Sequence, residues 1–216
     1  MRYSVDKMTM NDVPRVVEIE RLAYTTPWPP SAYRREIQEN RMARYIVVRD
    51  TWMKPPTPDA TRDEQKRPFP LSLLSRAPAT LSPEIANIIA FAGLWHMINE
   101  AHITTIATHP DYRGRGIGEL MLSTLIGVAY TTQAHYVTLE VRVSNSIAQN
   151  LYRKYGFAQT HIRRRYYSDN HEDAYVMSTP DITSESYRTR FAELCERLAN
   201  RLQNDSACEH GEAQNA

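Results

Sequence analysis

The feature that most constrains this chain is a glycine-rich turn at residues 113–118, which reads Arg-Gly-Arg-Gly-Ile-Gly. An apolar run with strand character at residues 103–108 precedes it, and an apolar helical run at residues 120–130 follows it. The first N–H groups of a helix are unpaired and carry a partial positive charge, and glycine lets the backbone approach an anion closely. The turn therefore predicts a phosphate site between a strand and a helix.

Two known patterns compete for this turn. The dinucleotide fingerprint needs G-x-G-x-x-G directly after a strand, with an acidic residue about 20 positions later. Gly114 and Gly116 fit it, and Glu140 would be the acidic residue, but Glu119 stands where the third glycine belongs. Residues 109–112 also separate the strand from the turn. Both mismatches disfavour a dinucleotide as the ligand.

The second pattern is R-x-x-G-x-G, formed by Arg113, Gly116 and Gly118. Downstream of it the chain reads Leu-Glu-Val-Arg-Val-Ser-Asn at residues 139–145, followed by Tyr152. This succession resembles the GCN5-related N-acetyltransferases. Among them it is most similar to the bacterial members that acetylate the N-terminal alanine of ribosomal protein S18.

The resemblance implies an α/β fold with a mixed, mostly antiparallel central sheet flanked by helices. Acetyl-CoA would lie where two central strands splay apart. The implied activity is transfer of the acetyl group to the N-terminal α-amine of a protein in the cytoplasm, with ribosomal protein S18 as the expected substrate. The residues that the resemblance assigns to acetyl-CoA are Ile106, Ala107, Thr108, Arg113, Gly114, Arg115, Gly116, Ile117, Gly118, Glu119, Asn145 and Tyr152.

Acetyl transfer from a thioester to an amine needs a base for the amine and a proton for the leaving thiolate. Glu140 matches the base of the family and Tyr152 matches its acid. An α-amine, with a pKa of about 7.7–8.0, is neutral far more often than a lysine, with a pKa of about 10.4. Each residue has a plainer alternative: Glu140 as a carboxylate paired with Arg142, Tyr152 as a core aromatic, and Asn145 as a helix N-cap.

Two pairs of residues resemble the loops that clamp the first residues of a peptide substrate. Pro27 and Trp28 follow the first expected helix, and Tyr166 and Tyr167 end an expected strand. Aromatic side chains there leave little room for a lysine stem, which favours an α-amine as acceptor. The alternative is that these are ordinary surface or core aromatics.

The rest of the chain divides around this domain. We expect the acetyltransferase domain over residues 1–180, interrupted at 51–84 by a proline-rich insertion between two strands. A helical extension at 181–203, packed on the domain or on a second copy, and a disordered tail at 204–216 would follow. The expected strands are 3–7, 45–49, 87–97, 102–108, 136–143, 159–167 and 174–178, and the expected helices of the domain are 13–22, 31–40, 116–130 and 146–155.

Composition excludes little but adds context. The net charge of +1 gives no argument for nucleic acid or a membrane as a partner. There is no apolar leader and no apolar run near the 20 residues that span a bilayer, and two cysteines suit a reducing cytoplasm. Scattered histidines predict no metal site. Two other functions stay open: acetylation of a small amine, and a non-catalytic module that binds acyl-CoA.

Overall fold

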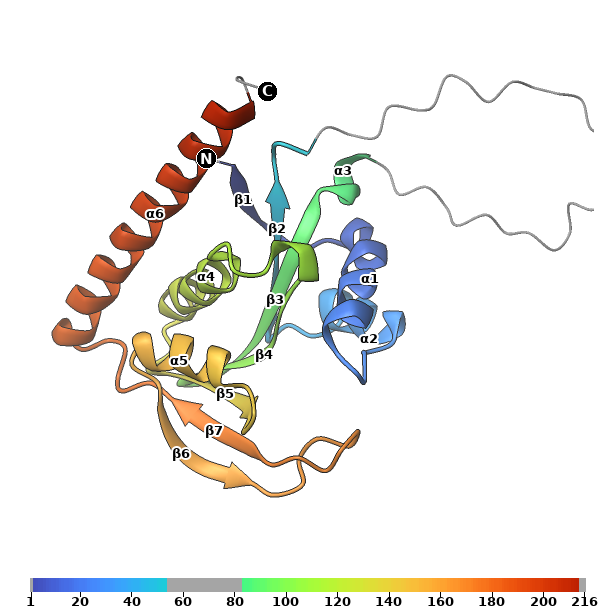
Figure 1. Cartoon of the computed structure of the whole chain (residues 1–216). Coiled ribbons are helices and arrows are strands. Elements are labelled where there is room, and N and C mark those ends of the chain that lie inside the picture. The colour runs from blue at the N-terminus through green and yellow to red at the C-terminus, as the bar shows by residue number, and fades with distance from the viewer. Residues whose placement is uncertain (1, 54–82, 214–216) are drawn as a thin grey trace, which may run out of the picture.

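A seven-stranded sheet forms the centre of the molecule in the computed structural model, which describes residues 2–53 and 83–213 (Figure 1). The strands lie in the order β1-β2-β3-β4-β5-β7-β6. Their bounds are β1 Tyr3–Lys7, β2 Ala43–Asp50, β3 Ile88–Met97, β4 Glu100–Thr108, β5 Tyr136–Arg142, β6 Ala158–Arg163 and β7 Ala174–Ser178. All neighbours are antiparallel except β4 and β5. The predicted mixed, mostly antiparallel sheet is confirmed.

β4 and β5 are parallel because the helix α4 (Ile117–Thr131) carries the chain back across the sheet between them. The two strands pair only over four residues each, up to Ile103 on β4 and Leu139 on β5. Beyond that point β4 continues to Thr108 and β5 continues to Arg142. The central strands therefore separate at their carboxyl ends, as expected, and open a gap in the sheet.

Helices cover both faces of the sheet. α1 and α2 lie on one face, α4 and α5 lie on the other, and α6 forms an outer layer beside α4 (Figure 1). The helices are α1 Val13–Ala23, α2 Pro30–Gln38, α3 Pro83–Ala86, α4, α5 Ser146–Lys154 and α6 Glu185–Ala213, with short 3₁₀ turns η1 Met10–Asp12 and η2 Pro110–Tyr112. The helices expected in the domain are all present, with ends that differ by at most two residues.

The larger of two apolar clusters holds the start of α4 in place. Met121, Leu122, Leu125 and Ile126 are fully buried, so α4 is apolar around most of its circumference. The sheet covers one side of the helix and α6 covers another. Each such side chain stabilises the fold by about 1.5–3 kcal/mol on leaving water. The glycine turn therefore starts a helix that is fixed on two sides.

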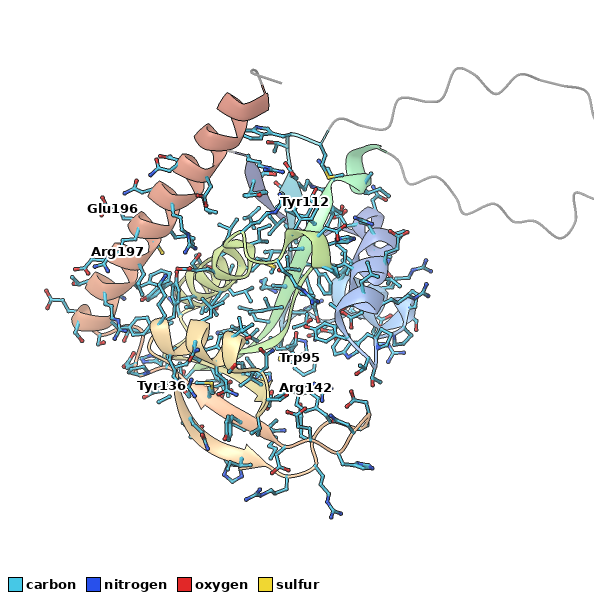
Figure 2. All side chains as sticks on the ribbon, viewed as in Figure 1. Trp95, Tyr112, Tyr136, Arg142, Glu196 and Arg197 are labelled. Atoms are coloured by element: carbon cyan, nitrogen blue, oxygen red, sulfur yellow. The ribbon has the colours of Figure 1, made fainter. Side chains whose placement is uncertain are left out.

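α6 packs on the domain through a stripe of buried side chains that includes Tyr187, Leu194, Leu198 and Leu202. Figure 2 shows Glu196 and Arg197 on the side of the helix that faces away from the body, and both are exposed. The helix continues to Ala213, beyond the expected boundary at 203, because residues 204–213 contain no proline to stop a helix that has already begun. Within the described ranges, no helix is long and apolar enough to cross a membrane.

The proline-rich segment belongs to the connection between β2 and β3. β2 ends at Asp50 and its antiparallel neighbour β3 begins at Ile88, so residues 51–84 lie in the connection between two adjacent strands. Residues 54–82 lie outside the described part of the chain. At the end of the insertion, Pro83 begins the one-turn helix α3, a position that suits the missing N–H of proline.

Candidate active site

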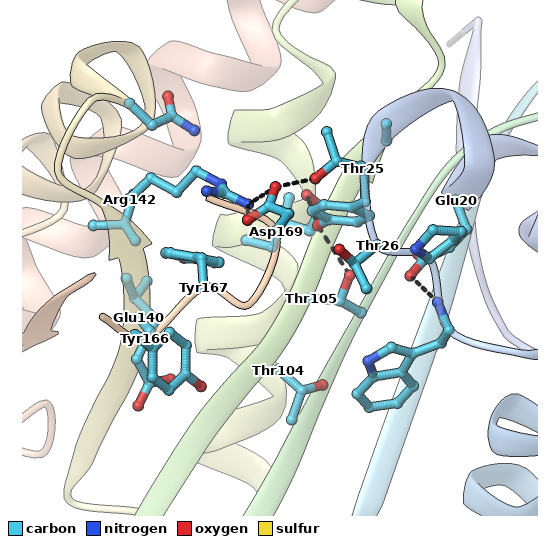
Figure 3. A pocket seen from close by; sticks show the side chains of 18 of the residues that line it. Glu20, Thr25, Thr26, Thr104, Thr105, Glu140, Arg142, Tyr166, Tyr167 and Asp169 are labelled. Carbon is cyan, nitrogen blue, oxygen red and sulfur yellow. Dashed lines mark hydrogen bonds and ion pairs between the residues drawn. The ribbon is translucent and has the colours of Figure 1, made fainter. Parts of the chain in front are cut away.

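The gap between β4 and β5 opens into a cleft of about 740 Å³ (Figure 3). Its walls are the carboxyl halves of β4 and β5, the end of α1 with the segment that follows it, α5 with its N-cap, and the loop between β6 and β7. The fold brings residues that were predicted for cofactor, acceptor and chemistry around this one space. The predicted residues that line it are Pro27, Trp28, Ile106, Glu140, Asn145, Tyr152, Tyr166 and Tyr167.

Glu140 lies on the β5 wall of the cleft, with its side chain 8% exposed. Its carboxylate is 3.0 Å from Nε2 of His102 and 3.0 Å from the guanidinium of Arg163. Burial alone would raise the pKa of Glu140, but the hydrogen bond and charge of His102, with the charge of Arg163, bring that pKa below its ordinary value. Glu140 is therefore ionised at neutral pH. Its alternative pairing with Arg142 is wrong, because Arg142 pairs with Asp169 instead.

Tyr152 faces the same cleft from α5 and is 9% exposed. Burial raises the pKa of its hydroxyl well above the ordinary value, and the neighbouring Tyr24 and Tyr167 raise it further. The hydroxyl therefore keeps its proton at neutral pH. The ring also packs against Phe157, with 5.8 Å between the ring centroids, so Tyr152 belongs to the core as well as to the cleft.

Two glycines of the turn adopt a left-handed backbone, with φ of 80° at Gly114 and 78° at Gly116. Gly116 is the N-cap of α4, so the unpaired N–H groups of the helix face the turn. Arg113 and Arg115 are exposed beside them. A Cβ on Gly116 would lie 2.9 Å from the guanidinium of Arg201 on α6. This cradle of backbone N–H groups and arginines suits an anion such as a pyrophosphate.

Three further residues of the turn present no free side chain to a ligand. Ile117 is buried, and Gly118 lies against Leu151 of α5, 3.9 Å from where its Cβ would be. The buried carboxylate of Glu119 is held by the tips of three side chains: Lys154 at 2.5 Å, Arg201 at 2.8 Å and Tyr155 at 2.9 Å. Any contact that Ile117 or Glu119 makes with a cofactor would therefore come from the backbone.

The three predicted strand residues differ in what they offer. Ile106 lines the cleft, and its carbonyl accepts a hydrogen bond of 2.9 Å from the Tyr24 hydroxyl. Ala107 is buried in the core under α1, and Thr108 pairs with Ala90 of β3. Only backbone groups are therefore available from Ala107. Past Ile103, β4 has left β5, so its backbone groups on that side are not used within the sheet.

Asn145 caps a helix and also faces the cleft. Its side-chain oxygen accepts a hydrogen bond of 3.1 Å from the N–H of Ala148 and so caps α5. Asn145 also lines the cleft at the end of β5.

Pro27 and Trp28 are held in place by a buried carboxylate. Glu20 of α1 accepts hydrogen bonds from the N–H of Trp28 at 3.1 Å and from the hydroxyl of Tyr33 at 2.7 Å. Burial raises the pKa of Glu20, while these two donors oppose the shift. Trp28 also packs its ring against that of Tyr33, with 5.6 Å between the centroids. The segment after α1 is therefore fastened to the α1–α2 face of the sheet.

Tyr166 and Tyr167 lie in the loop between β6 and β7, because β6 ends earlier than expected, at Arg163. Arg142 of β5 fastens this loop: it stacks 3.8 Å from the centre of the Tyr167 ring and pairs with Asp169 at 2.8 Å. Asp169 in turn accepts a hydrogen bond from Thr25, across the cleft. Figure 3 shows Arg142, Asp169 and Thr25 joined in a line. The two loops that the sequence predicts to hold the acceptor are thereby connected over the cleft.

Several residues of this site were missed by sequence reasoning. Glu20, Thr25 and Asp169 act through partners that lie far away in the sequence, so no local pattern marks them. The sequence gives only a weak indication that His102 belongs to the site: strand alternation places it on the same face of its strand as Glu100. Within the described residues, no group of three or more histidine, cysteine, aspartate or glutamate side chains is placed to hold a metal ion.

Comparison with known proteins gives a consistent result. Residues 47–157 match the family described as "Acetyltransferase (GNAT) family". A candidate ribosomal protein bS18-alanine N-acetyltransferase of Bacillus subtilis is 30% identical over 82% of this chain and 94% of its own length. The ribosomal protein bS18-alanine N-acetyltransferase of Salmonella typhimurium is 28% identical over 82% and 97%. The crystal structure of the ribosomal-protein-S18-alanine N-acetyltransferase from Escherichia coli matches with a TM-score of 0.63 and 25% identity, covering 85% of this chain and 97% of that one.

Proposed function

The chain belongs to the acetyltransferase (GNAT) family, and we propose that it moves the acetyl group of acetyl-CoA to the N-terminal α-amine of a protein. The proposed substrate is ribosomal protein S18, the protein named for its relatives in Bacillus and Salmonella. The observation that carries the proposal is the shared cleft, where an ionised Glu140 and a protonated Tyr152 face the space left by the splayed strands.

The glycine turn is the proposed site of the acetyl-CoA pyrophosphate. Left-handed glycines at 114 and 116 keep Cβ atoms out of the cradle, and the N-terminus of α4 offers unpaired N–H groups. Arg113 and Arg115 supply positive charge at the surface of the turn. The acetyl end would then reach the cleft along the backbone of β4 near Ile106, since that strand no longer pairs with β5 there.

In the proposed reaction Glu140 accepts a proton from the α-ammonium group, and the neutral amine attacks the thioester carbonyl. The C–N bond forms as the C–S bond breaks, and Tyr152 gives its proton to the leaving thiolate. The attacking nitrogen loses its second proton as the amide forms, and this proton restores the Tyr152 hydroxyl. The overall reaction converts an ammonium group and a thioester into an amide, a thiol and one free proton. An α-amine suits the depressed pKa of Glu140, because that amine is neutral about a tenth of the time at pH 7.

The acceptor loops support a chain end as substrate. The connection from Arg142 through Asp169 to Thr25 crosses the cleft, and Trp28, Tyr166 and Tyr167 line it. The end of a peptide can enter beneath such a connection. An internal lysine would have to bring the peptide backbone on both sides of it close to the connection, which leaves less room. The two other functions, acetylation of a small amine and non-catalytic binding of acyl-CoA, stay as alternatives.

The test is release of free CoA thiol in the presence of acetyl-CoA and one of three acceptors. These are a peptide that begins with alanine, the same peptide with a blocked N-terminus and an internal lysine, and a linear polyamine. We expect release with the first peptide alone. Faster release with the polyamine would favour a small amine as substrate, and no release with any acceptor would overturn both enzymatic functions.

A further inference from the structure

A line of three polar side chains leads away from Glu140 along β4 and β5. Nε2 of His102 lies 3.0 Å from the Glu140 carboxylate, and Nδ1 of His102 lies 2.9 Å from the hydroxyl of Thr138. The Thr138 hydroxyl donates in turn to the carboxylate of Glu100. The parallel register sets His102 directly beside Thr138, so the contacts follow from the pairing of the two strands.

This line runs from the buried base toward water. The side chain of Glu140 is 8% exposed, that of His102 is 19% exposed and that of Glu100 is 42% exposed. The other end of the Glu140 carboxylate is occupied by Arg163 of β6, at 3.0 Å. Of these two partners of Glu140, His102 is the one that links it, through Thr138, to a second carboxylate near the surface.

The number of hydrogens in this line depends on the His102 ring. Its three contacts each require one hydrogen. The Thr138 hydroxyl supplies one, ionised Glu140 and Glu100 supply none, and the His102 ring supplies one as the neutral imidazole or two as the imidazolium. The ring can therefore take up a proton on the Glu140 side and give one up on the Thr138 side, and the imidazolium satisfies all three contacts.

We propose that His102, Thr138 and Glu100 form a proton exit that takes the proton from Glu140 after it has deprotonated the amine. The proposal rests on the proposed function, because it needs Glu140 to act as the base. His102 accepts the proton at Nε2 and releases the one at Nδ1 through the Thr138 hydroxyl to Glu100, which exchanges it with water. The acetyl transfer frees one proton per turnover, and this line carries it out and leaves Glu140 ionised for the next amine.

His102 and Thr138 are positioning residues in this scheme, and Glu140 alone touches the amine. The charged groups that face His102 are Glu100 on its own strand and Glu140 on β5, with Arg163 on the far side of Glu140. Because the His102 hydrogen bond and charge lower the pKa of Glu140, loss of the ring raises that pKa and moves the acid limb of the rate profile to higher pH.

The sharpest test is the nearly isosteric change Thr138→Val, which breaks the line but leaves Glu140 and His102 in place. We expect kcat for an alanine-initiated peptide to fall at least about fivefold, a fraction of the usual effect of acid–base catalysis. The KM for acetyl-CoA should not change, and Thr138→Ser should restore kcat because it keeps the hydroxyl. The matched control His135→Gln, at an exposed histidine paired with Asp181, should leave kcat unchanged.

A second variant guards against a merely structural effect. His102→Ala should have a lower kcat than the wild type. Added imidazole should restore part of that kcat, since a diffusible base can replace the missing ring as proton acceptor. A wild-type kcat in both Thr138→Val and His102→Ala would overturn the proton exit. A low kcat that imidazole does not raise in His102→Ala, together with an equally low kcat in Thr138→Ser, would overturn it as well. A wild-type protein that acetylates no peptide would instead overturn the proposed function, so the two failures can be told apart.

Discussion

The two substrate sites that we propose are constructed in different ways. On the cofactor side, which lies outside the residues that line the cleft, the backbone forms the site: left-handed glycines at 114 and 116 and the N-terminus of α4 form the cradle. On the acceptor side, side-chain contacts form the site: Arg142, Asp169 and Thr25 connect one loop to the other. The first side is contiguous in the sequence and the second is drawn from residues more than a hundred positions apart. A change on one side should therefore affect the binding of one substrate and leave the other.

The largest effect is expected where the two sides meet. Glu140→Gln keeps the shape of the side chain but removes the base, so kcat should fall about 10²–10⁴-fold at neutral pH. The affinity for acetyl-CoA should stay within about twofold, because Glu140 lies away from the glycine turn. Steady-state rates and calorimetric titration with acetyl-CoA check both parts. A large loss of cofactor affinity would instead give Glu140 a structural role.

On the cofactor side, Gly116→Ala should raise the Kd for acetyl-CoA about tenfold. A left-handed backbone costs a residue with a Cβ about 1–2 kcal/mol, and the new Cβ would meet Arg201 at 2.9 Å. Titration with acetyl-CoA measures the change. Gly127→Ala, in the same helix with open space around its Cβ, is the control and should bind normally. Equal affinities for the two variants would contradict the role of the turn.

On the acceptor side, Asp169→Asn should raise the KM for a peptide about twofold to fivefold, an effect of the size found for partly exposed charged contacts. The KM for acetyl-CoA should not move. Asp6→Asn, which removes a carboxylate at the exposed ion pair with Arg49, serves as control. If Asp169→Asn weakens both substrates equally, the two sides are not independent.

The pH dependence of peptide binding should differ from the pH dependence of the reaction rate. Arg142 and the hydroxyl of Thr25 lower the pKa of Asp169 to about 2, the hydrogen bond from Thr25 being the larger cause. Its depressed pKa means that the carboxylate supports the folded loop fully above about pH 4 and loses that contribution only as the pH falls through about 2. Peptide KM should therefore stay constant between pH 5 and 8 while kcat/KM rises with the neutral fraction of the amine. A peptide KM that rises below pH 6 would break this separation.

The smallest effect concerns the link between α6 and the cofactor side. Burial alone would raise the pKa of Glu119, but Lys154, Arg201 and Tyr155 lower it overall. The carboxylate thus stabilises the fold above its unfolded pKa of about 4.5, and this contribution is lost as the pH falls through the lower folded value. Glu119→Gln should lower Tm by about 2–4 °C at pH 7, for a loss of about 1 kcal/mol. Thermal unfolding at several pH values should show the difference shrinking below about pH 4.

The contrast between the two sides also explains what the sequence could and could not reveal. The glycine turn, Glu140, Asn145 and Tyr152 are readable because each depends on local backbone geometry or on a short motif. Strand and helix periodicity likewise predicted the sheet and its helices, apart from the ends of β6 and α6. Periodicity cannot show how far a helix runs once it is nucleated, which is why the boundary at 203 was wrong.

Contacts between distant segments were out of reach. Thr25 meets Asp169 only after α1 and the β6–β7 loop have come together over the cleft. His102 meets Glu140 only because β4 and β5 are parallel in one register, and a shift of that register would break the contact. Such partners depend on the assembled sheet, so the sequence singled out Glu140 but not the groups that set its pKa.

The most direct test of the central claim is to locate the acetyl group in a reacted peptide. A peptide that begins with alanine and carries an internal lysine would be incubated with the wild-type protein and acetyl-CoA, then sequenced by tandem mass spectrometry. We predict one added acetyl group, on the α-nitrogen of the alanine. Acetyl on the lysine side chain, with the α-amine unmodified, would contradict the account.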